Sequence, residues 1–303
     1  MPREGGASSN RRIIGSLQAS VFTGSSAFAD EDDGREDVSA NNELSGKVAI
    51  VTGAGRNIGR AIALALADGG ASIVVNARSN RAEADAVARE IEAAGVRALA
   101  YIADVADAAA VQAMADMAVK HFGRIDILIN NAALRREKPF AEMSYLEWRE
   151  ILDATLDGAF HCAKACLPAL RKSGAGTIVN IGGLSAHTGA KNRAHVVTAK
   201  AGIVGFTRAL AHDLASGGIT VNCVVPGLIG TPRPKDKPEP AHHRSRQTIT
   251  GERGKPDDVA AAVRFLCGPA ARYITGQAIH ASGGAYLGAQ CMARWRISLR
   301  SGG

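Results

Sequence analysis

The sequence predicts an α/β fold with a single doubly wound parallel sheet and helices on both of its faces. Short apolar runs rich in Val and Ile alternate with Ala-rich segments from Lys47 onward. The runs are continuously apolar, which is typical of parallel strands buried on both faces. Strands are therefore expected at 48–53, 71–77, 97–105, 125–132, 176–183 and 219–227, with a last short strand near 277–284. Helices are expected near 58–69, 81–94, 107–122, 144–172 and 195–216.

The composition excludes several classes of protein. No run of eighteen apolar residues occurs in the 303-residue chain, so no membrane-spanning helix is expected. The net charge is +7, but only four Tyr and two Trp are present to stack on bases, and we expect no nucleic-acid partner. The five cysteines are scattered without a completing His or acidic pair, so we expect no metal site.

The chain divides into one domain and two tails. No linker interrupts residues 44–288, which we assign to a single domain. Residues 1–43 are polar and contain NRRIIGSLQASVFTGSSAFAD, which has a twin arginine, a weakly apolar stretch and an AFA sequence. This segment is either a disordered extension, which we favour, or a twin-arginine export signal. The expected location is accordingly the cytoplasm, with the periplasm as the alternative. Residues 289–303 are expected to be an irregular tail.

A glycine-rich turn follows the first expected strand. The stretch TGAGRNIG (52–59) leads directly into the helix that begins near residue 58. A helix N-terminus presents free backbone N–H groups and positive potential to a pyrophosphate, and glycines let the backbone approach closely. Because the turn lies between a buried strand and an apolar-faced helix, it predicts a dinucleotide site.

Several motifs, in order along the chain, resemble those of the short-chain dehydrogenase/reductase family, classical type. The similarity covers about residues 44–288, and within the family it is greatest to 3-oxoacyl-ACP-reductase-like enzymes. The motifs are TGAGRNIG (52–59), ADV (103–105), NNAA (130–133), ITVNCVVPGLIGT (219–231), RGKPDDVA (253–260) and ITGQAIHASGG (274–284). The resemblance implies a Rossmann-type fold, a nicotinamide cofactor, a small-molecule carbonyl or alcohol substrate, and a homodimer or homotetramer.

The same resemblance places a set of residues around the dinucleotide. They are Gly53, Gly55, Arg56, Asn57, Ile58, Gly59, Arg78, Asp104, Val105, Asn131, Ala132, Lys200, Pro226, Gly227 and Thr231. Members that prefer NAD carry an acid after the second strand, where this chain has Ala77 followed by Arg78. Together with Arg56 this favours NADP(H) over NAD(H), because guanidinium groups suit a 2′-phosphate. Asn57 replaces the second glycine of the motif, and Asn tolerates positive φ better than other side chains.

The family's catalytic tetrad of Asn, Ser, Tyr and Lys is mostly replaced. By alignment of the motifs, the lysine is Lys200, the tyrosine position is Val196, the serine position is Gly183 and the asparagine position is Thr155. Tyr and Lys are four residues apart in the family because that spacing puts both on one helical face. Lys200 is expected to hold the nicotinamide ribose, but valine has no proton to give.

Two other side chains are candidates for the missing proton donor. His195 is adjacent to Val196, and an imidazole is suited to acid–base chemistry at neutral pH. Ser185 lies two residues beyond the serine position and could face the same way along an extended segment. We therefore name Lys200, His195 and Ser185 as the candidate catalytic residues, with His187 as the alternative partner of Ser185.

Three functions are compatible with these residues. The first is an NADP(H)-dependent oxidoreductase with a non-standard proton donor. The second is a non-catalytic dinucleotide-binding or scaffold protein, and a weaker third is a lyase or dehalogenase-like activity. The segment 231–256 is expected to cover the substrate, and its proline-rich, basic composition favours a small polar substrate. Its adjacent His242 and His243 do not share a helical face and are not expected to bind metal.

Overall fold

The computed structural model describes residues 42–231 and 248–288. All of them belong to one compact unit. The predicted tail at 289–303 lies outside the described residues, as do His242 and His243. Of the predicted N-terminal segment 1–43, only residues 42 and 43 are described. These predictions, and the domain bounds drawn from them, stay predictions.

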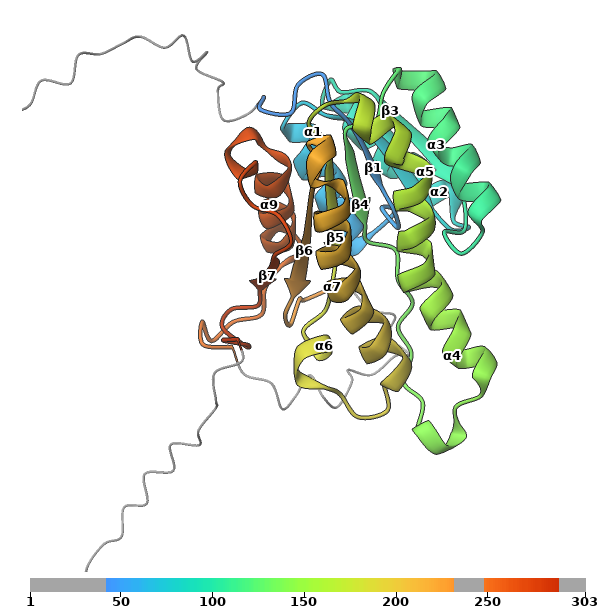
Figure 1. The fold of residues 1–303 in the computed structure, drawn as a ribbon, viewed down its shortest axis with the longest axis vertical. Coiled ribbons are helices and arrows are strands. Elements are labelled where there is room, and N and C mark those ends of the chain that lie inside the picture. The colour runs from blue at the N-terminus through green and yellow to red at the C-terminus, as the bar shows by residue number, and fades with distance from the viewer. Residues whose placement is uncertain (1–41, 232–247, 289–303) are drawn as a thin grey trace, which may run out of the picture. The chain divides into compact units, whose positions relative to one another are not determined.

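A seven-stranded parallel sheet forms the centre of this unit (Figure 1). Its order is β3-β2-β1-β4-β5-β6-β7, and every neighbouring pair is parallel. The strands are β1 (Val48–Val51), β2 (Ser72–Ala77), β3 (Ala98–Ile102), β4 (Ile127–Asn130), β5 (Thr177–Ile181), β6 (Thr220–Pro226) and β7 (Ala278–Ala281). Each lies within a predicted run, so the doubly wound parallel sheet is confirmed. The reversal of strand order falls between β1 and β4, where such folds bind their ligands.

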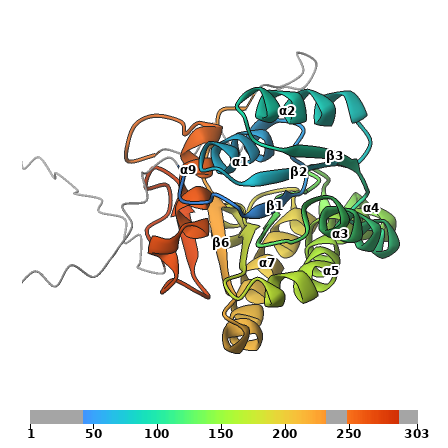
Figure 2. The ribbon, with the colours of Figure 1, turned by 90° about the horizontal axis from the view of Figure 1, so that it is seen from above.

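Helices cover both faces of the sheet (Figure 2). One face carries α1 (Asn57–Asp68), α2 (Arg81–Ala93) and α9 (Pro256–Cys267), and the other carries α3 (Ala108–Phe122), α5 (Gly158–Lys172) and α7 (Ala194–Leu214). Two apolar clusters fill the spaces between sheet and helices, one on each side. Burial on both faces is the reason the strands read as continuous apolar runs. Within the described residues, no helix is long and apolar enough to cross a membrane.

One predicted helix is not continuous. The segment expected at 144–172 consists of α4 (Tyr145–Leu152), a π-helical turn at Asp153–Asp157, and α5. Arg149 contacts the carboxylates of Asp153 and Asp157, which lie in this turn. The apolar period continues through the turn, so the sequence pattern alone did not separate the two helices. Single π turns are frequent at functional sites, and this one contains Thr155, the predicted asparagine position of the tetrad.

Two further helices were not predicted. A short helix, α6 (Ser185–Thr188), lies in the segment that follows β5, where an extended conformation was expected for Ser185. The other is α9, which begins with Pro256 at its first position and packs against α1. Proline is favourable at that position because its missing N–H has no helical partner there. In Figure 1 the carboxyl ends of the strands point toward α6.

Candidate active site

Two residues of the glycine-rich turn between β1 and α1 have a left-handed backbone conformation. Gly53 has φ 62° and Asn57, the first residue of α1, has φ 50°. Asn57 therefore adopts the conformation for which its replacement of glycine was expected to be tolerated, and the predicted turn is confirmed. Gly59 allows the closest approach, because a Cβ there would lie 2.2 Å from Gly53 O and 2.5 Å from Asn131 Nδ2.

Hydrogen bonds tie this turn to the ends of the neighbouring strands. Asn131 Nδ2 donates to Thr52 O at 2.9 Å and to Gly53 O at 3.1 Å. Thr52 Oγ1 accepts from the backbone N–H of Asn131 at 2.9 Å and of Ala132 at 3.0 Å. Asn76 Oδ1 accepts from Gly53 N at 3.3 Å, and its Nδ2 donates to Ala103 O at 3.1 Å. These hydrogen bonds link the carboxyl ends of β1, β2, β3 and β4 at one edge of the sheet.

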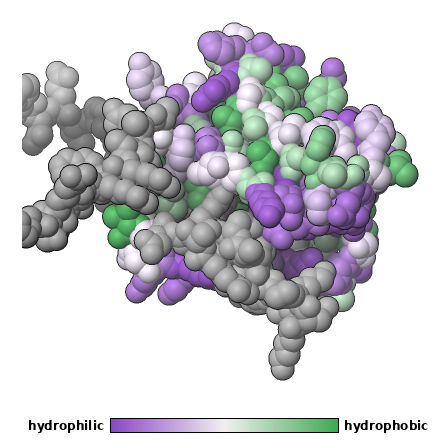
Figure 3. Space-filling model, turned by 90° about the horizontal axis from the view of Figure 1, so that it is seen from below, coloured by the Kyte–Doolittle hydropathy of each residue, from purple (hydrophilic) through white to green (hydrophobic). Residues whose placement is uncertain are grey.

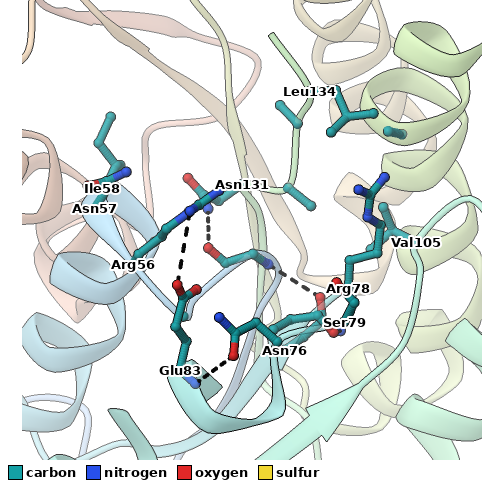
Figure 4. A pocket seen from close by; sticks show the side chains of 18 of the residues that line it. Arg56, Asn57, Ile58, Asn76, Arg78, Ser79, Glu83, Val105, Asn131 and Leu134 are labelled. Atoms are coloured by element: carbon teal, nitrogen blue, oxygen red, sulfur yellow. Dashed lines mark hydrogen bonds and ion pairs between the residues drawn. The ribbon is translucent and has the colours of Figure 1, made fainter. Parts of the chain in front are cut away.

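A pocket of about 680 Å³ opens at this edge (Figure 4). Most of the predicted cofactor residues line it: Gly53, Gly55, Arg56, Asn57, Ile58, Gly59, Arg78, Asp104, Val105, Asn131, Ala132 and Thr231. The other three, Lys200, Pro226 and Gly227, are not among its lining residues. Gly227 packs closely on Ser282, since a Cβ there would lie 2.6 Å from Ser282 Cα. The roles given to these three residues stay predictions.

The pocket also has lining residues that the sequence did not single out. They are Asn76, Ala77, Ser79, Asn80, Glu83, Ala103, Ala133, Leu134, Arg135, Arg136 and Ala154. Arg135 and Arg136 follow the NNAA motif directly, so two adjacent arginines after a predicted strand were a signal that could have been used. The turn from β2 to α2 brings Glu83 to the pocket. Glu83 belongs to none of the motifs, so the sequence did not indicate that it lines the pocket.

Opposite charges face the pocket near the phosphate loop. Arg56 Nη1 lies 4.0 Å from Glu83 Oε1. Arg78 lies beside Val105 on the other side of the pocket (Figure 4). The buried Ala77 ends β2 without a carboxylate. Arg135 and Arg136 also line the pocket, and its two carboxylates, Glu83 and Asp104, do not come from the end of β2.

Lys200 is a buried cation on α7. Its Nζ donates a hydrogen bond to the carbonyl oxygen of Ile181, the last residue of β5, at 2.6 Å. Burial, followed by the positive charge of Arg135, lowers the pKa of the Lys200 ammonium to about 7. Removing a charged amine from water favours its neutral form. The group can therefore give up or take up a proton near neutral pH.

Gly183 and Val196, the predicted serine and tyrosine positions, carry no polar side chain. A Cβ at Gly183 would lie 3.6 Å from Lys200 Cγ, in ordinary van der Waals contact, so the serine position borders the lysine stem directly. Val196 is buried in an apolar cluster with Ile151, Leu152 and Ala199. The tyrosine position is thus occupied by a packed side chain that has no polar atom.

Comparisons with known proteins agree with this geometry. A family model described as Enoyl-(Acyl carrier protein) reductase matches residues 53–286. The 3-oxoacyl-[acyl-carrier-protein] reductase FabG of Staphylococcus aureus is 40% identical over 242 residues, which are 80% of this chain and 98% of the relative. The 3-oxoacyl-[acyl-carrier-protein] reductase of Synechocystis sp. is 42% identical over 244 residues, 80% of this chain and 97% of the relative. The chain belongs to the short-chain dehydrogenase/reductase family.

Two solved structures of the family are similar to this one. A short chain dehydrogenase from Burkholderia cenocepacia, in complex with NADP, is 38% identical with a TM-score of 0.75, covering 80% of this chain and 99% of that one. A 7 alpha-hydroxysteroid dehydrogenase, complexed with NADH and 7-oxo glycochenodeoxycholic acid, is 34% identical with a TM-score of 0.73, covering 80% and 96%. The predicted family and the interpretation of the chain as an oxidoreductase are confirmed.

Within this dehydrogenase/reductase fold, the candidate proton donors lie in different surroundings. His195 is 1% exposed, and neither ring nitrogen makes a hydrogen bond of good geometry within the described residues. Burial lowers the pKa of His195, so its neutral form predominates at pH 7. Ser185 is buried at the start of α6. His187, its alternative partner, packs 4.6 Å from the ring of His280 on β7.

The asparagine position also has an unusual environment. Thr155 is buried, and its Oγ1 has no hydrogen-bond partner within residues 42–231 and 248–288. A buried hydroxyl without a partner is uncommon, and ordered water often satisfies such a group. Thr155 lies on the π turn that packs against α7, the helix that carries Lys200. No cluster of three or more His, Cys, Asp or Glu residues suited to a metal occurs in the described part of the chain.

Proposed function

We propose that this protein is an NADP(H)-dependent oxidoreductase that interconverts a small polar carbonyl compound and its alcohol, with Lys200 as the proton donor. The observation that carries the proposal is the buried Lys200 ammonium, which lies beside Gly183 and donates to the carbonyl oxygen of Ile181 at the end of β5. The four similar proteins described above are named as reductases or dehydrogenases, which supports carbonyl–alcohol chemistry.

The pocket fits a phosphorylated dinucleotide. Gly59 leaves no room for a side chain between the turn and Asn131, which keeps backbone N–H groups accessible to a pyrophosphate. Arg56 and Arg78 supply the cations that a 2′-phosphate requires, and Ala77 supplies no carboxylate to oppose it. The NADP complex of the Burkholderia cenocepacia relative supports the same cofactor.

NADP(H) would supply the hydride, and the chain's own residues would handle the proton. In the direction of reduction, the Lys200 ammonium donates a proton to the carbonyl oxygen as negative charge develops there, and becomes a neutral amine. Solvent then returns the proton to Nζ. A pKa of about 7 suits this step, because the donor is partly protonated at neutral pH and transfers its proton readily. In the direction of oxidation, the amine accepts the proton of the alcohol.

Basic side chains near Lys200 and His195 support a polar substrate. The positive charges of Arg135 and Arg193 act on Lys200, and those of Arg193 and Arg136 act on His195. Arg135 and Arg136 also line the pocket. Hydrophilic and hydrophobic residues are intermixed on the coloured part of the face drawn in Figure 3. A compact carbonyl compound with polar substituents matches these surroundings better than a bulky apolar one.

Binding and turnover test the proposal in sequence. NADPH is titrated by fluorescence, and turnover is followed by NADPH absorbance with a panel of small polar ketones and aldehydes and one steroid ketone. We expect NADPH binding, turnover of the small polar compounds, and a reduction rate that falls as pH rises through about 7, because the protonated amine is consumed. Absence of NADPH binding would contradict the proposal.

Substitutions separate the candidate donors. Lys200→Arg keeps a cation but cannot release a proton at these pH values, so it should abolish turnover while NADPH still binds. Lys191→Met is the control, because it replaces an exposed lysine in the loop before α7. This variant should retain activity. Loss of turnover in His195→Ala or Ser185→Ala, with activity retained in Lys200→Arg, would assign the proton to one of those residues instead.

A non-catalytic dinucleotide-binding protein is the second candidate. The apolar packing of Val196 and the absence of a side chain at Gly183 favour it. It predicts NADPH binding without turnover of any panel compound by the wild-type protein. The lyase or dehalogenase-like alternative has no supporting feature in the described site.

We also propose a homo-oligomer located in the cytoplasm. Apolar side chains are exposed on α3 (Met117 and Val119) and on α5 (Phe160), which supports pairing through these helices. Light scattering coupled to gel filtration distinguishes a dimer or tetramer from a monomer. Fractionation of cells that express the full chain tests the location against periplasmic export.

A further inference from the structure

Glu83 is one of two acidic side chains that line the pocket within the described residues, the other being Asp104. It lies in the first turn of α2, where its backbone N–H donates to Asn80 Oδ1 at 3.2 Å. A Cβ at Gly55 would lie 3.3 Å from Glu83 Cβ and 3.5 Å from its Oε2. The carboxylate therefore rests against the glycine-rich turn, on the side of the pocket where Arg56 lies (Figure 4).

Arg56 and Glu83 form a long, solvent-accessible ion pair. Their closest charged atoms are 4.0 Å apart, and the side chains are 75% and 38% exposed. Exposed pairs of this kind are weak, so an anion of higher charge can draw Arg56 away from Glu83. Arg56 can therefore pair with Glu83 or with the 2′-phosphate, which NADP(H) carries and NAD(H) lacks.

The two dinucleotides meet Glu83 differently. A 2′-phosphate carries up to two negative charges, which the carboxylate repels at short range. It also competes with Glu83 for Arg56. A free 2′-hydroxyl carries no charge, and a carboxylate can accept its hydrogen bond. All three effects have the same sign, since each one disfavours NADP(H) relative to NAD(H).

We propose that Glu83 determines cofactor selectivity by limiting the preference for NADP(H), so that the wild-type site also accepts NAD(H). The inference rests on the proposed function, because it concerns the same dinucleotide pocket. Arg56 and Arg78 attract the 2′-phosphate, and Glu83 offsets part of that attraction through Arg56.

The test compares dissociation constants, which do not depend on catalysis. NADPH and NADH are titrated against the full chain by fluorescence, for the wild type and for Glu83→Gln. The glutamine keeps the size of the side chain and removes its charge. We expect the ratio of the dissociation constant for NADH to that for NADPH to rise roughly tenfold in the variant.

Glu90→Gln is the matched control. Glu90 lies on the same helix and pairs with Arg60 at 2.5 Å, and neither residue lines the pocket. This variant removes the same charge and breaks an equivalent glutamate–arginine pair, so the ratio should stay as in the wild type. Glu83→Ala provides a second uncharged variant, and thermal unfolding shows that each protein is folded before titration.

The outcomes separate the two proposals. NADPH binding to the wild type with an unchanged ratio in both Glu83 variants would overturn this inference and leave the proposed function standing. A ratio that falls would also overturn it, because it would mean that Glu83 holds Arg56 in place for the phosphate. Failure of the wild type to bind NADPH would overturn the proposed function and this inference together.

Discussion

Lys200 Nζ donates a hydrogen bond to Ile181 O at 2.6 Å, which ties this buried lysine to the end of strand β5. The contact fixes the amine at the point where β5 gives way to the loop containing Gly183. In this position the lysine is buried, and it keeps a hydrogen-bond partner whether it is charged or neutral. Its protonation state then depends on pH near neutrality.

Lys200 should make folding stability depend on pH. Burial lowers its pKa from 10.5 to about 7. Between these values the unfolded chain binds more protons than the folded one, so this residue's contribution to stability rises with pH. Below pH 7 both states are protonated, and the full cost of burying the charge is present. Lys200→Met removes this cost, so its free energy of unfolding should exceed that of the wild type most at pH 7. The difference should shrink from pH 7 to pH 10, by at most about 1.4 kcal/mol per pH unit.

Denaturant unfolding at several pH values measures this difference. Lys191→Met is again the control, because it makes the same substitution at an exposed lysine. A difference between Lys200→Met and the wild type that stays constant from pH 7 to pH 10 would show that the buried lysine does not titrate in this window.

Restoring the serine and tyrosine should increase carbonyl reduction. Gly183→Ser places its Cβ in ordinary contact with Lys200, so it should fold normally. Val196→Tyr enlarges a side chain in a packed cluster and should lower the free energy of unfolding by about 1–3 kcal/mol. Despite this cost, the double variant gains a phenol as proton donor. Turnover of the ketone panel should rise above the wild-type rate.

The matched control is Gly183→Ser with Val196→Phe. It has the same ring in the same cluster and lacks only the hydroxyl group. Equal turnover in the tyrosine and phenylalanine variants would mean that the added phenol does not reach the substrate. Thermal unfolding of both variants separates a change of chemistry from a change of stability.

Gly59 should not tolerate a side chain. A Cβ there would lie 2.2 Å from Gly53 O, which is backbone and cannot turn away. Gly59→Ala should therefore displace the phosphate loop and weaken NADPH binding at least tenfold, with a lower melting temperature. Gly205→Ala on α7 is the control, since nothing lies within 4 Å of its added Cβ. Titration of NADPH against both variants tests the expectation.

Asn57 should be replaceable by glycine but not by alanine. Its φ of 50° is accessible to Asn and Gly, whereas a left-handed conformation costs other L-residues about 1–2 kcal/mol. Asn57→Gly should bind NADPH as the wild type does. Asn57→Ala should lose on the order of 1 kcal/mol of stability and bind more weakly. Equal stability of the two variants in denaturant unfolding would contradict the assignment of strain to this position.

Local patterns predicted the strands and the phosphate loop because their causes are local. Burial on both faces of a parallel sheet requires continuous apolar runs, and each observed strand falls inside one. The turn at 52–59 depends on residues that tolerate positive φ, which Gly53 and Asn57 supply. Patterns could not separate α4 from α5, because the apolar period continues through the π turn at Asp153–Asp157.

The sequence by itself determined the fold and the family, and it predicts that three tetrad positions are replaced, at Thr155, Gly183 and Val196. Only the tertiary structure decided the environments of the groups that remain. The low pKa of Lys200 comes from burial between β5 and α7, and the contact of Glu83 with Arg56 comes from the packing of α2 against the phosphate loop. Desolvation and charge–charge contacts depend on distances between residues far apart in the chain, and no local pattern encodes those distances.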